Sequence, residues 1–280
     1  MERKITNKLI SDFEVYLIQE EKSASTIEKY IRDIKAFFKW SFGRKLTKNV
    51  VLEYKSHLVN NFAPASINSM LSSVNNFFEY NKWYDLKVKS LKIQRQIFAG
   101  KDKELRKDEY EKLLRAAKRK NNEQLYLLMQ TLCSCGLRVS ELRFITVEAL
   151  NKQTAIIKCK GKMRQVFLPI SLCRLLKRYA KSKKISSGAV FITKTGKPLV
   201  RSNIWKMMKA LCNDAGVPSS KVFPHNLRHL FARTYYSIEK DIVRLADILG
   251  HSSVNTTRIY TMENGDSCRN QIQRLGLLRC

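Results

Sequence analysis

The 280-residue sequence lacks several patterns that mark common classes of protein. No C-x-x-C pair occurs among its seven cysteines, so neither a zinc ribbon nor a dithiol redox motif is indicated, and reduced thiols are expected. No stretch approaches the roughly 18 consecutive apolar residues of a membrane span. The opening residues, MERKITNKLI, predict no signal peptide. We therefore expect a cytoplasmic protein with no membrane partner.

Cofactor and metal motifs are also missing. No Walker motif is present, and no carboxylate cluster suggests a pair of metal ions, which argues against a metal-dependent nuclease or transposase. His225 and His229 have the spacing of a zincin helix, but position 226 is Asn where that motif needs Glu. We expect no cofactor and no metal.

Acidic residues are scarce. Lys and Arg number 53 against 24 Asp and Glu, a formal net charge of +29. Residues 1–92 have a net charge of +6 and residues 93–280 a net charge of +23. Such an excess indicates a polyanionic partner, with nucleic acid the first candidate and an anionic membrane surface the second. The alternative is that lysine-rich helix faces are merely solvated. Binding to nucleic acid would depend steeply on salt.

The hydrophobic periodicity divides the chain into two regions. Residues 1–92 show helical spacing, with a capping box at Ser25 and Glu28, a helix near Val50–Asn60 and another from Pro64. Residues 93–103 break the pattern and indicate a linker.

Residues 104–280 mix helices with a few strands. Residues 154–169 alternate as a hairpin with its turn at 160–163. The other expected elements are helices at Arg106–Lys120, Gln124–Cys135, Asn203–Ala215 and Asp241–Leu249, a strand at Ala189–Thr193, a helix opened by Pro224 and a last helix containing Tyr260.

Three short segments gather the cationic and titratable side chains. They read CGLRVSEL over 135–142, PHNLRH over 224–229 and LGHSS over 249–253, which is followed by TRIY over 257–260. On a helix, His225 and Arg228 share a face, so both can present donors to one phosphate. A surface His and Arg on a basic helix is the alternative for that segment alone.

In this order the segments resemble the tyrosine recombinase, or phage integrase, family. Its pattern is an Arg in G-L-R-x-S-E-L, a Lys in a β-hairpin turn, H-x-L-R-H, L-G-H, and a Tyr nine residues after that last His. The matching residues are Arg138, Lys160, His225 with Arg228, His251 and Tyr260. The resemblance covers the whole chain, because the N-terminal helices look like the family's core-binding domain. The layout is that of a short, Xer-like integrase without an arm-binding domain.

The hairpin lysine has two candidate positions. The family often shows G-K-G there, and Cys159 stands in place of the first Gly, which favours Lys160. Lys162 is the alternative. A third possibility is that the hairpin lysines simply follow the DNA backbone.

The resemblance implies a phosphoryl transfer for which these residue types are suited. Arg138 and Arg228 would stabilise charge on the non-bridging oxygens, with a hydrogen bond from His251. Tyr260 would attack phosphorus and form a 3′-phosphotyrosyl link.

Proton transfer falls to two further side chains in this interpretation. Lys160 would protonate the leaving 5′-oxygen. His225 would take or relay the phenol proton, since a free phenol has a pKa of about 10. Glu141 would orient a cation, while Tyr235 and Tyr236 are expected to pack rather than react.

The expected fold is mainly α. It has an N-terminal helical core-binding bundle over 1–92, a linker over 93–103 and an α+β catalytic domain with a small antiparallel sheet over 104–280, together closing around double-stranded DNA. The resemblance implies a site-specific recombinase that acts as a homo-tetramer on two DNA sites with paired half-sites, in association with the nucleoid. The segment after Tyr260, with Leu275 and Leu277, is expected to dock on a neighbouring protomer.

Three alternatives stay open. A type IB topoisomerase-like enzyme would use the same chemistry to relax DNA, and a catalytically inactive protein of this fold would only bind it. A basic membrane-surface protein is disfavoured because the chain has no amphipathic anchor.

Overall fold

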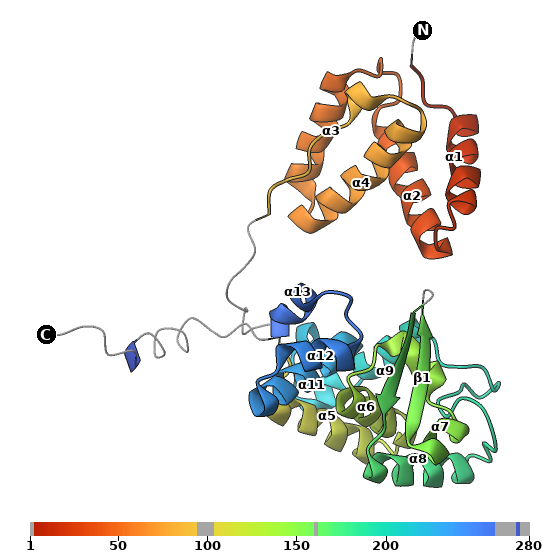
Figure 1. The fold of residues 1–280 in the computed structure, drawn as a ribbon, viewed down its shortest axis with the longest axis vertical. Helices are drawn as coiled ribbons and strands as arrows, with labels where there is room; N and C mark the ends of the chain where they lie inside the picture. The colour runs from red at the N-terminus through yellow and green to blue at the C-terminus, as the bar shows by residue number, and fades with distance from the viewer. Residues whose placement is uncertain (1–2, 94–103, 160–161, 261–272, 275–280) are drawn as a thin grey trace, which may run out of the picture. The chain divides into compact units, whose positions relative to one another are not determined.

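The computed structural model describes residues 3–93, 104–159, 162–260 and 273–274 (Figure 1). The chain divides into two compact units, Met1–Arg95 and Gln96–Cys280, and each has its own apolar core. The fold is mainly helical with one small sheet, which confirms the expected class. In the described part of the chain, no helix is long and apolar enough to cross a membrane.

The first unit is a helical bundle. Phe13, Phe37 and Phe77 are fully buried at its centre, and Phe77 meets Phe13 edge to face with 5.3 Å between ring centroids. The side chain of Thr6 accepts a hydrogen bond from the Leu9 backbone and caps the first helix. Its elements are α1 (Asn7–Gln19), α2 (Ala24–Trp40), α3 (Lys48–Asn61), α4 (Pro64–Tyr80) and the 3₁₀ helix η1 (Tyr84–Leu86).

The predicted capping box at Ser25 is wrong. Helix α2 begins two residues earlier than that box requires, with Ser23 as its N-cap residue and no side-chain cap bond. Instead, the Ser23 hydroxyl pairs with the hydroxyls of Ser25 and Thr26 at 3.2 and 2.8 Å. The hydroxyls therefore bond one another instead of capping the helix.

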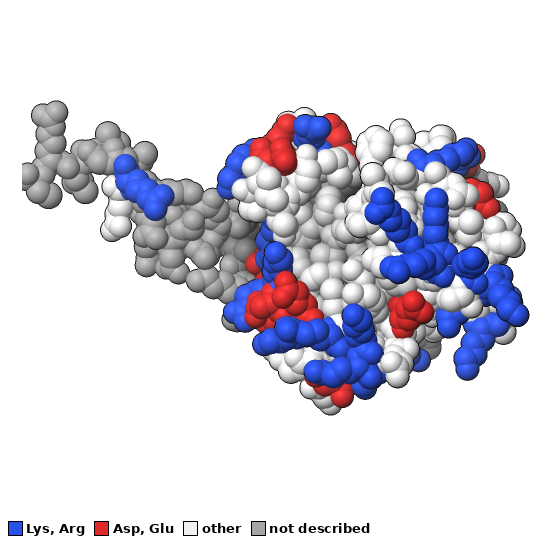
Figure 2. Space-filling model, turned by 90° about the horizontal axis from the view of Figure 1, so that it is seen from below, with Lys and Arg blue, Asp and Glu red and all other residues white. Residues whose placement is uncertain are grey.

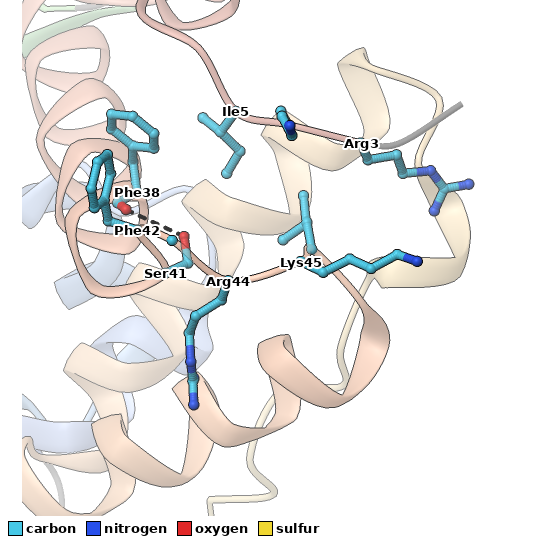
Figure 3. Close-up of a pocket in the computed structure, with 10 residues that line it drawn as sticks. Arg3, Ile5, Phe38, Ser41, Phe42, Arg44 and Lys45 are labelled. Atoms are coloured by element: carbon cyan, nitrogen blue, oxygen red, sulfur yellow. Dashed lines mark hydrogen bonds between the residues drawn. The ribbon is translucent and has the colours of Figure 1, made fainter.

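A pocket of about 410 Å³ lies at the C-terminal end of α2 (Figure 3). Phe38 and Phe42 form one side of it, and Arg3, Arg44 and Lys45 bring positive charge. Arg3 is paired with Asp85 and Arg44 with Glu53, so both arginines have local counterions. None of the predicted site residues that the structure describes lines this pocket.

The second unit surrounds a larger core. Helices α6 and α11 pack against each other in its middle, and the hairpin covers one side (Figure 1). Its helices are α5 (Lys107–Arg119), α6 (Glu123–Cys135), η3 (Val139–Phe144), α7 (Val147–Lys152), α8 (Ile170–Ser182), α9 (Arg201–Lys209), α10 (Cys212–Ala215), η4 (Ser219–Lys221), α11 (Pro224–Glu239), α12 (Ile242–Leu249), α13 (Val254–Thr257) and η5 (Arg258–Tyr260).

The sheet consists of β1 (Thr154–Cys159) and β2 (Lys162–Phe167), which pair antiparallel with Ile157 opposite Arg164. The predicted hairpin is therefore present, and its turn at 160–161 lies outside the described residues. The expected strand at Ala189–Thr193 is reduced to isolated bridges at Ala189 and Ile192, because neither side offers a continuous strand to pair with.

Two helix predictions need adjustment. The expected helix Asn203–Ala215 is two helices, α9 and α10, separated at Ala210 and Leu211. The last predicted helix is the short α13 followed by a single 3₁₀ turn, η5, that ends at Tyr260. The segment expected to dock on a neighbouring protomer lies almost entirely outside the described residues.

Candidate active site

Arg138 is presented by the turn that ends α6. The helix stops at Gly136, whose φ of +59° lies in the left-handed region that glycine adopts without steric cost. Glu141 then holds Arg138 twice, accepting from its backbone N–H at 2.7 Å and from its guanidinium at 3.0 Å. The Arg138 side chain keeps 40% of its surface exposed, so it can still meet a ligand.

Arg228 lies on α11, which opens with Pro224 at its first position, as expected. Its side chain is buried, with 1% of its surface exposed. The guanidinium donates to the carbonyls of Gly136 at 2.6 Å and Leu249 at 2.7 Å, and to Nε2 of His251 at 2.8 Å. Burial first, and then the positive charge of Arg138, lower the pKa of Arg228 to about 10. It therefore stays charged at neutral pH.

His251 follows α12, which ends at Gly250 with a φ of +65°. Burial first, and then the charges of Arg228 and Arg138, lower the pKa of His251 to about 4. The ring is therefore neutral at pH 7. Because Nε2 accepts from Arg228, we assign the proton to Nδ1, which then donates to the Thr257 hydroxyl at 2.8 Å.

Tyr260 is buried against two histidine rings. It meets His229 edge to face with 4.7 Å between ring centroids, and it stacks on His251 at 6.0 Å. Its charge would raise the pKa of Arg228, so the phenol lies within electrostatic range of that guanidinium. Only 4% of Tyr260 is exposed.

His225 lies one step further away. Its ring is 4.6 Å from that of His229, edge to face, and it has no described contact with Tyr260. Partial burial first, and then Arg228 and Arg138, lower the pKa of His225. Burial, followed by the charges of His225 and Arg228, lowers the pKa of His229 to about 4. Of the two histidines on α11, the one in contact with Tyr260 is thus His229, which the sequence interpretation had weighed only as a metal ligand.

The structure brings together Arg138, Arg228, His251 and Tyr260 from four separate segments. Lys160, the preferred hairpin lysine, lies outside the described residues, and so does the side chain of Lys162. Tyr235 and Tyr236 pack around the small apolar cluster of Ala232, Leu245, Leu249 and Tyr260, in keeping with a packing role. Among the described residues, no group of three His, Cys, Asp or Glu is placed to hold a metal ion.

Sequence reasoning missed Arg164 on β2. Its guanidinium donates to the second oxygen of Glu141 at 2.7 Å and to the carbonyl of Ile248. The signal was available in the alternation of the strand, since Arg164 is on the same face as Val166 and opposite Ile157, both buried. A charged residue on the core-facing side of a strand needs a buried partner.

Comparison with known proteins identifies the family of the chain. The pattern of the phage integrase family matches residues 103–266, and that of the phage integrase N-terminal SAM-like domain matches residues 10–84. The chain belongs to the phage integrase family. It is 31% identical to the TnP I resolvase of Bacillus thuringiensis over 94% of this chain and 98% of that protein.

Other members give the same result. The chain is 30% identical to tyrosine recombinase XerD of Listeria monocytogenes, over 91% of this chain and 94% of that protein. A crystal structure of XerA recombinase matches 99% of this chain and all of that one, with 25% identity and a TM-score of 0.53. A lambda integrase dimer bound to a COC′ core site shares the fold, with 16% identity over 93% of this chain and 96% of that one, at a TM-score of 0.75.

Proposed function

We propose that this tyrosine recombinase cuts and rejoins DNA at specific sites through a covalent bond between Tyr260 and a 3′-phosphate. The observation that carries the proposal is the shared environment of Arg138, Arg228, His251 and Tyr260. A phenol stacked on a histidine, beside a buried guanidinium and a half-exposed one, is suited to attack on a bound phosphodiester. The relatives named as a resolvase and as tyrosine recombinases support the same reaction class.

The first step breaks the bond from phosphorus to the 5′-oxygen and forms one to the Tyr260 oxygen. Arg138 and Arg228 stabilise the charge that develops on the non-bridging oxygens. Lys160, or Lys162 in its place, gives a proton to the leaving 5′-oxygen. In the second step a 5′-hydroxyl from the partner strand attacks the phosphotyrosine, so the phosphodiester is restored without ATP.

We propose that the phenol proton leaves through His229 and His225, whose rings follow Tyr260 in successive edge-to-face contacts. His229 touches Tyr260 and is neutral, so it can accept a proton; a pKa of about 4 means that it does not keep it. The proton then passes to His225, whose ring lies against His229 and is partly open to solvent. In this proposal His225 acts as the outer end of a relay rather than as the group in contact with the nucleophile.

Double-stranded DNA with paired half-sites is the proposed partner, bound by a homo-tetramer that holds two such sites. Structures of this fold include a lambda integrase tetramer bound to a Holliday junction. A DNA recombinase works beside its substrate, so we place the protein in the cytoplasm with the nucleoid. We also propose that the two units close around the duplex.

Positive charge is not confined to the candidate site. Figure 2 shows Lys and Arg gathered on the face where α8 lies, and exposed cations of that helix include Arg174, Lys177, Arg178 and Lys181. Net charge alone therefore does not identify the DNA-binding face. The proposal rests on the arrangement around Tyr260.

A nicked duplex that traps the covalent intermediate tests the proposal. A library of sites in this format, incubated with the wild-type protein, should yield a protein–DNA adduct that survives denaturation, and Tyr260→Phe should yield none. EDTA should not reduce the yield. An adduct formed by Tyr260→Phe would refute the assignment of the nucleophile.

A second assay separates the proposal from its alternatives. A topoisomerase-like enzyme would relax supercoiled plasmid that carries no selected site, whereas a recombinase should act only on plasmid carrying one. An inactive DNA-binding protein would shift the duplex and form no adduct.

A further inference from the structure

Arg164 is a buried cation that the proposed reaction has not used. Only 13% of its side chain is exposed, although arginine is almost never buried without a partner. It bonds Glu141 on one side and the Ile248 carbonyl on the other. It thus joins two of the segments that carry the proposed site, and it does so from the strand that follows the hairpin turn.

The contact with Glu141 controls Arg138. Glu141 is 2% exposed and shares its two oxygens between Arg138 and Arg164. Burial alone would raise the pKa of Glu141, but the Arg138 backbone N–H and the Arg164 charge outweigh it and lower that pKa. Without Arg164, the full carboxylate charge would fall on Arg138, which would be drawn towards it and away from a phosphate.

The contact with Ile248 controls the segment that presents His251. The Ile248 carbonyl accepts from Arg164, and the next carbonyl, that of Leu249, accepts from Arg228. Two guanidiniums therefore satisfy carbonyls in the last turn of α12, where the helix dipole favours positive charge. These bonds fix the end of α12 immediately before His251.

Gly250 leaves room for this arrangement. A Cβ atom built at position 250 would lie 2.3 Å from Cδ of Arg164 and 2.9 Å from its Nε. The arginine therefore lies directly against the backbone of the L-G-H segment. Two features therefore favour glycine at position 250: the φ of +65° and the closeness of the Arg164 side chain.

We infer that Arg164 is a positioning residue that sets the geometry of Arg138 and His251, the half of the site that binds phosphate. Its contacts, with Glu141 and the end of α12, give it no part in the acid step that the proposed function assigns to the hairpin lysine. The inference rests on the proposed function. Replacing Arg164 should therefore impair phosphate binding in the reaction and leave protonation of the leaving group intact.

The test compares two leaving groups on the nicked duplex. One duplex has the natural 5′-oxygen at the cleaved bond, and the other has sulfur in its place. A thiol has a pKa of about 8.5, far below that of an alcohol, so a sulfur leaving group needs no acid. A defect in the leaving-group acid is restored by sulfur, whereas a defect in phosphate binding is not.

Arg164→Gln should form adduct about 10²-fold more slowly than wild type on both duplexes, because misplaced donors cost about that factor. Lys160→Ala should be slow on the oxygen duplex and restored on the sulfur duplex. Arg174→Gln, the same change at an exposed position of α8, should match wild type. Binding of intact duplex, measured by fluorescence anisotropy, should change less than the rate does.

Two results would overturn the inference: an Arg164→Gln rate within threefold of wild type, or a slow rate that sulfur restores. If Arg164→Gln unfolds below the assay temperature, Arg164→Lys is tested in its place, and the same two results would overturn the inference. Lysine keeps the positive charge, but its single ammonium cannot bond both Glu141 and the Ile248 carbonyl. Failure of the proposed function gives a different result, because wild type would then form no adduct or Tyr260→Phe would form one.

Discussion

Replacing Gly136 with alanine should destabilise the catalytic unit and slow cleavage. The added Cβ would lie 2.5 Å from Cδ1 of Phe231 and 3.1 Å from Cδ2 of Leu249, both closer than van der Waals contact allows. The left-handed backbone costs about 1 kcal/mol for a residue with a Cβ, and overpacking of this kind costs about 1–3 kcal/mol. We expect a loss of about 2–4 kcal/mol in the free energy of unfolding.

The same change should act on the chemistry through Arg228. The Gly136 carbonyl accepts from its guanidinium at 2.6 Å, so a shift of that peptide moves a phosphate donor. Misplacement by about 1 Å can cost 10²-fold, and we expect adduct formation to slow about 10- to 100-fold.

Urea denaturation followed by circular dichroism measures the stability loss, and the nicked duplex measures the rate. Adding Phe231→Leu to Gly136→Ala should recover the part of the stability loss that comes from overpacking. It should not recover the part that comes from the left-handed backbone at position 136. A Gly136→Ala protein within 0.5 kcal/mol of wild type, or a double variant whose losses simply add, would refute the reasoning.

Three further outcomes are expected. Thr257→Val removes the partner of His251 Nδ1 and should slow adduct formation at least about tenfold, while Thr257→Ser should not. Because the pKa values of His229 and His251 are about 4 in the folded protein against 6.5 ordinarily, stability should be complete above pH 6.5 and fall towards pH 4. Between pH 6.5 and pH 4 the free energy of unfolding should fall by about 1–2 kcal/mol, after allowance for solvent screening. Urea titrations at both pH values should show a smaller fall for His229→Gln than for wild type. Asp33→Ala removes the carboxylate that Lys29 contacts at 2.6 Å, and it should lower the free energy of unfolding by about 2–3 kcal/mol. Urea denaturation measures the loss, and the exposed control Asp12→Ala should show no change.

The hydrophobic periodicity of the sequence predicted most helices because the buried side chains of each helix lie on one face. The expected helix at Val50–Asn60 differs from α3 by only a few residues, and Pro64 begins α4 as its missing N–H allows. The predicted cap at Ser25 was wrong because neighbouring hydroxyls compete for the same partners. The strand at Ala189–Thr193 was wrong because a strand needs a neighbour, and one sequence segment does not say whether a neighbour exists.

The motif residues were predictable, while their contacts were not. Spacing of three placed His225 and Arg228 on one face, but nothing local indicates that His229 is the ring that meets Tyr260. That contact depends on how η5 returns to α11, which is a long-range feature. Arg164 was missed because its partners, Glu141 and the Ile248 carbonyl, are distant in the sequence, although strand alternation places it facing the core.

The charges of the site suit the transition state of the proposed reaction better than its ground state. Arg138 and Arg164 bond the carboxylate of Glu141, and Arg228 lies within electrostatic range of it. These three guanidiniums and one carboxylate together leave a net charge of +2. The histidines add none, since His251 is neutral at pH 7. A phosphodiester brings one negative charge, and the pentacoordinate phosphorus formed by attack of a phenolate brings two. The net charge of the described guanidiniums and carboxylate therefore matches this doubly charged species better than the bound phosphodiester, and electrostatic stabilisation that grows along the reaction path is what lowers a barrier.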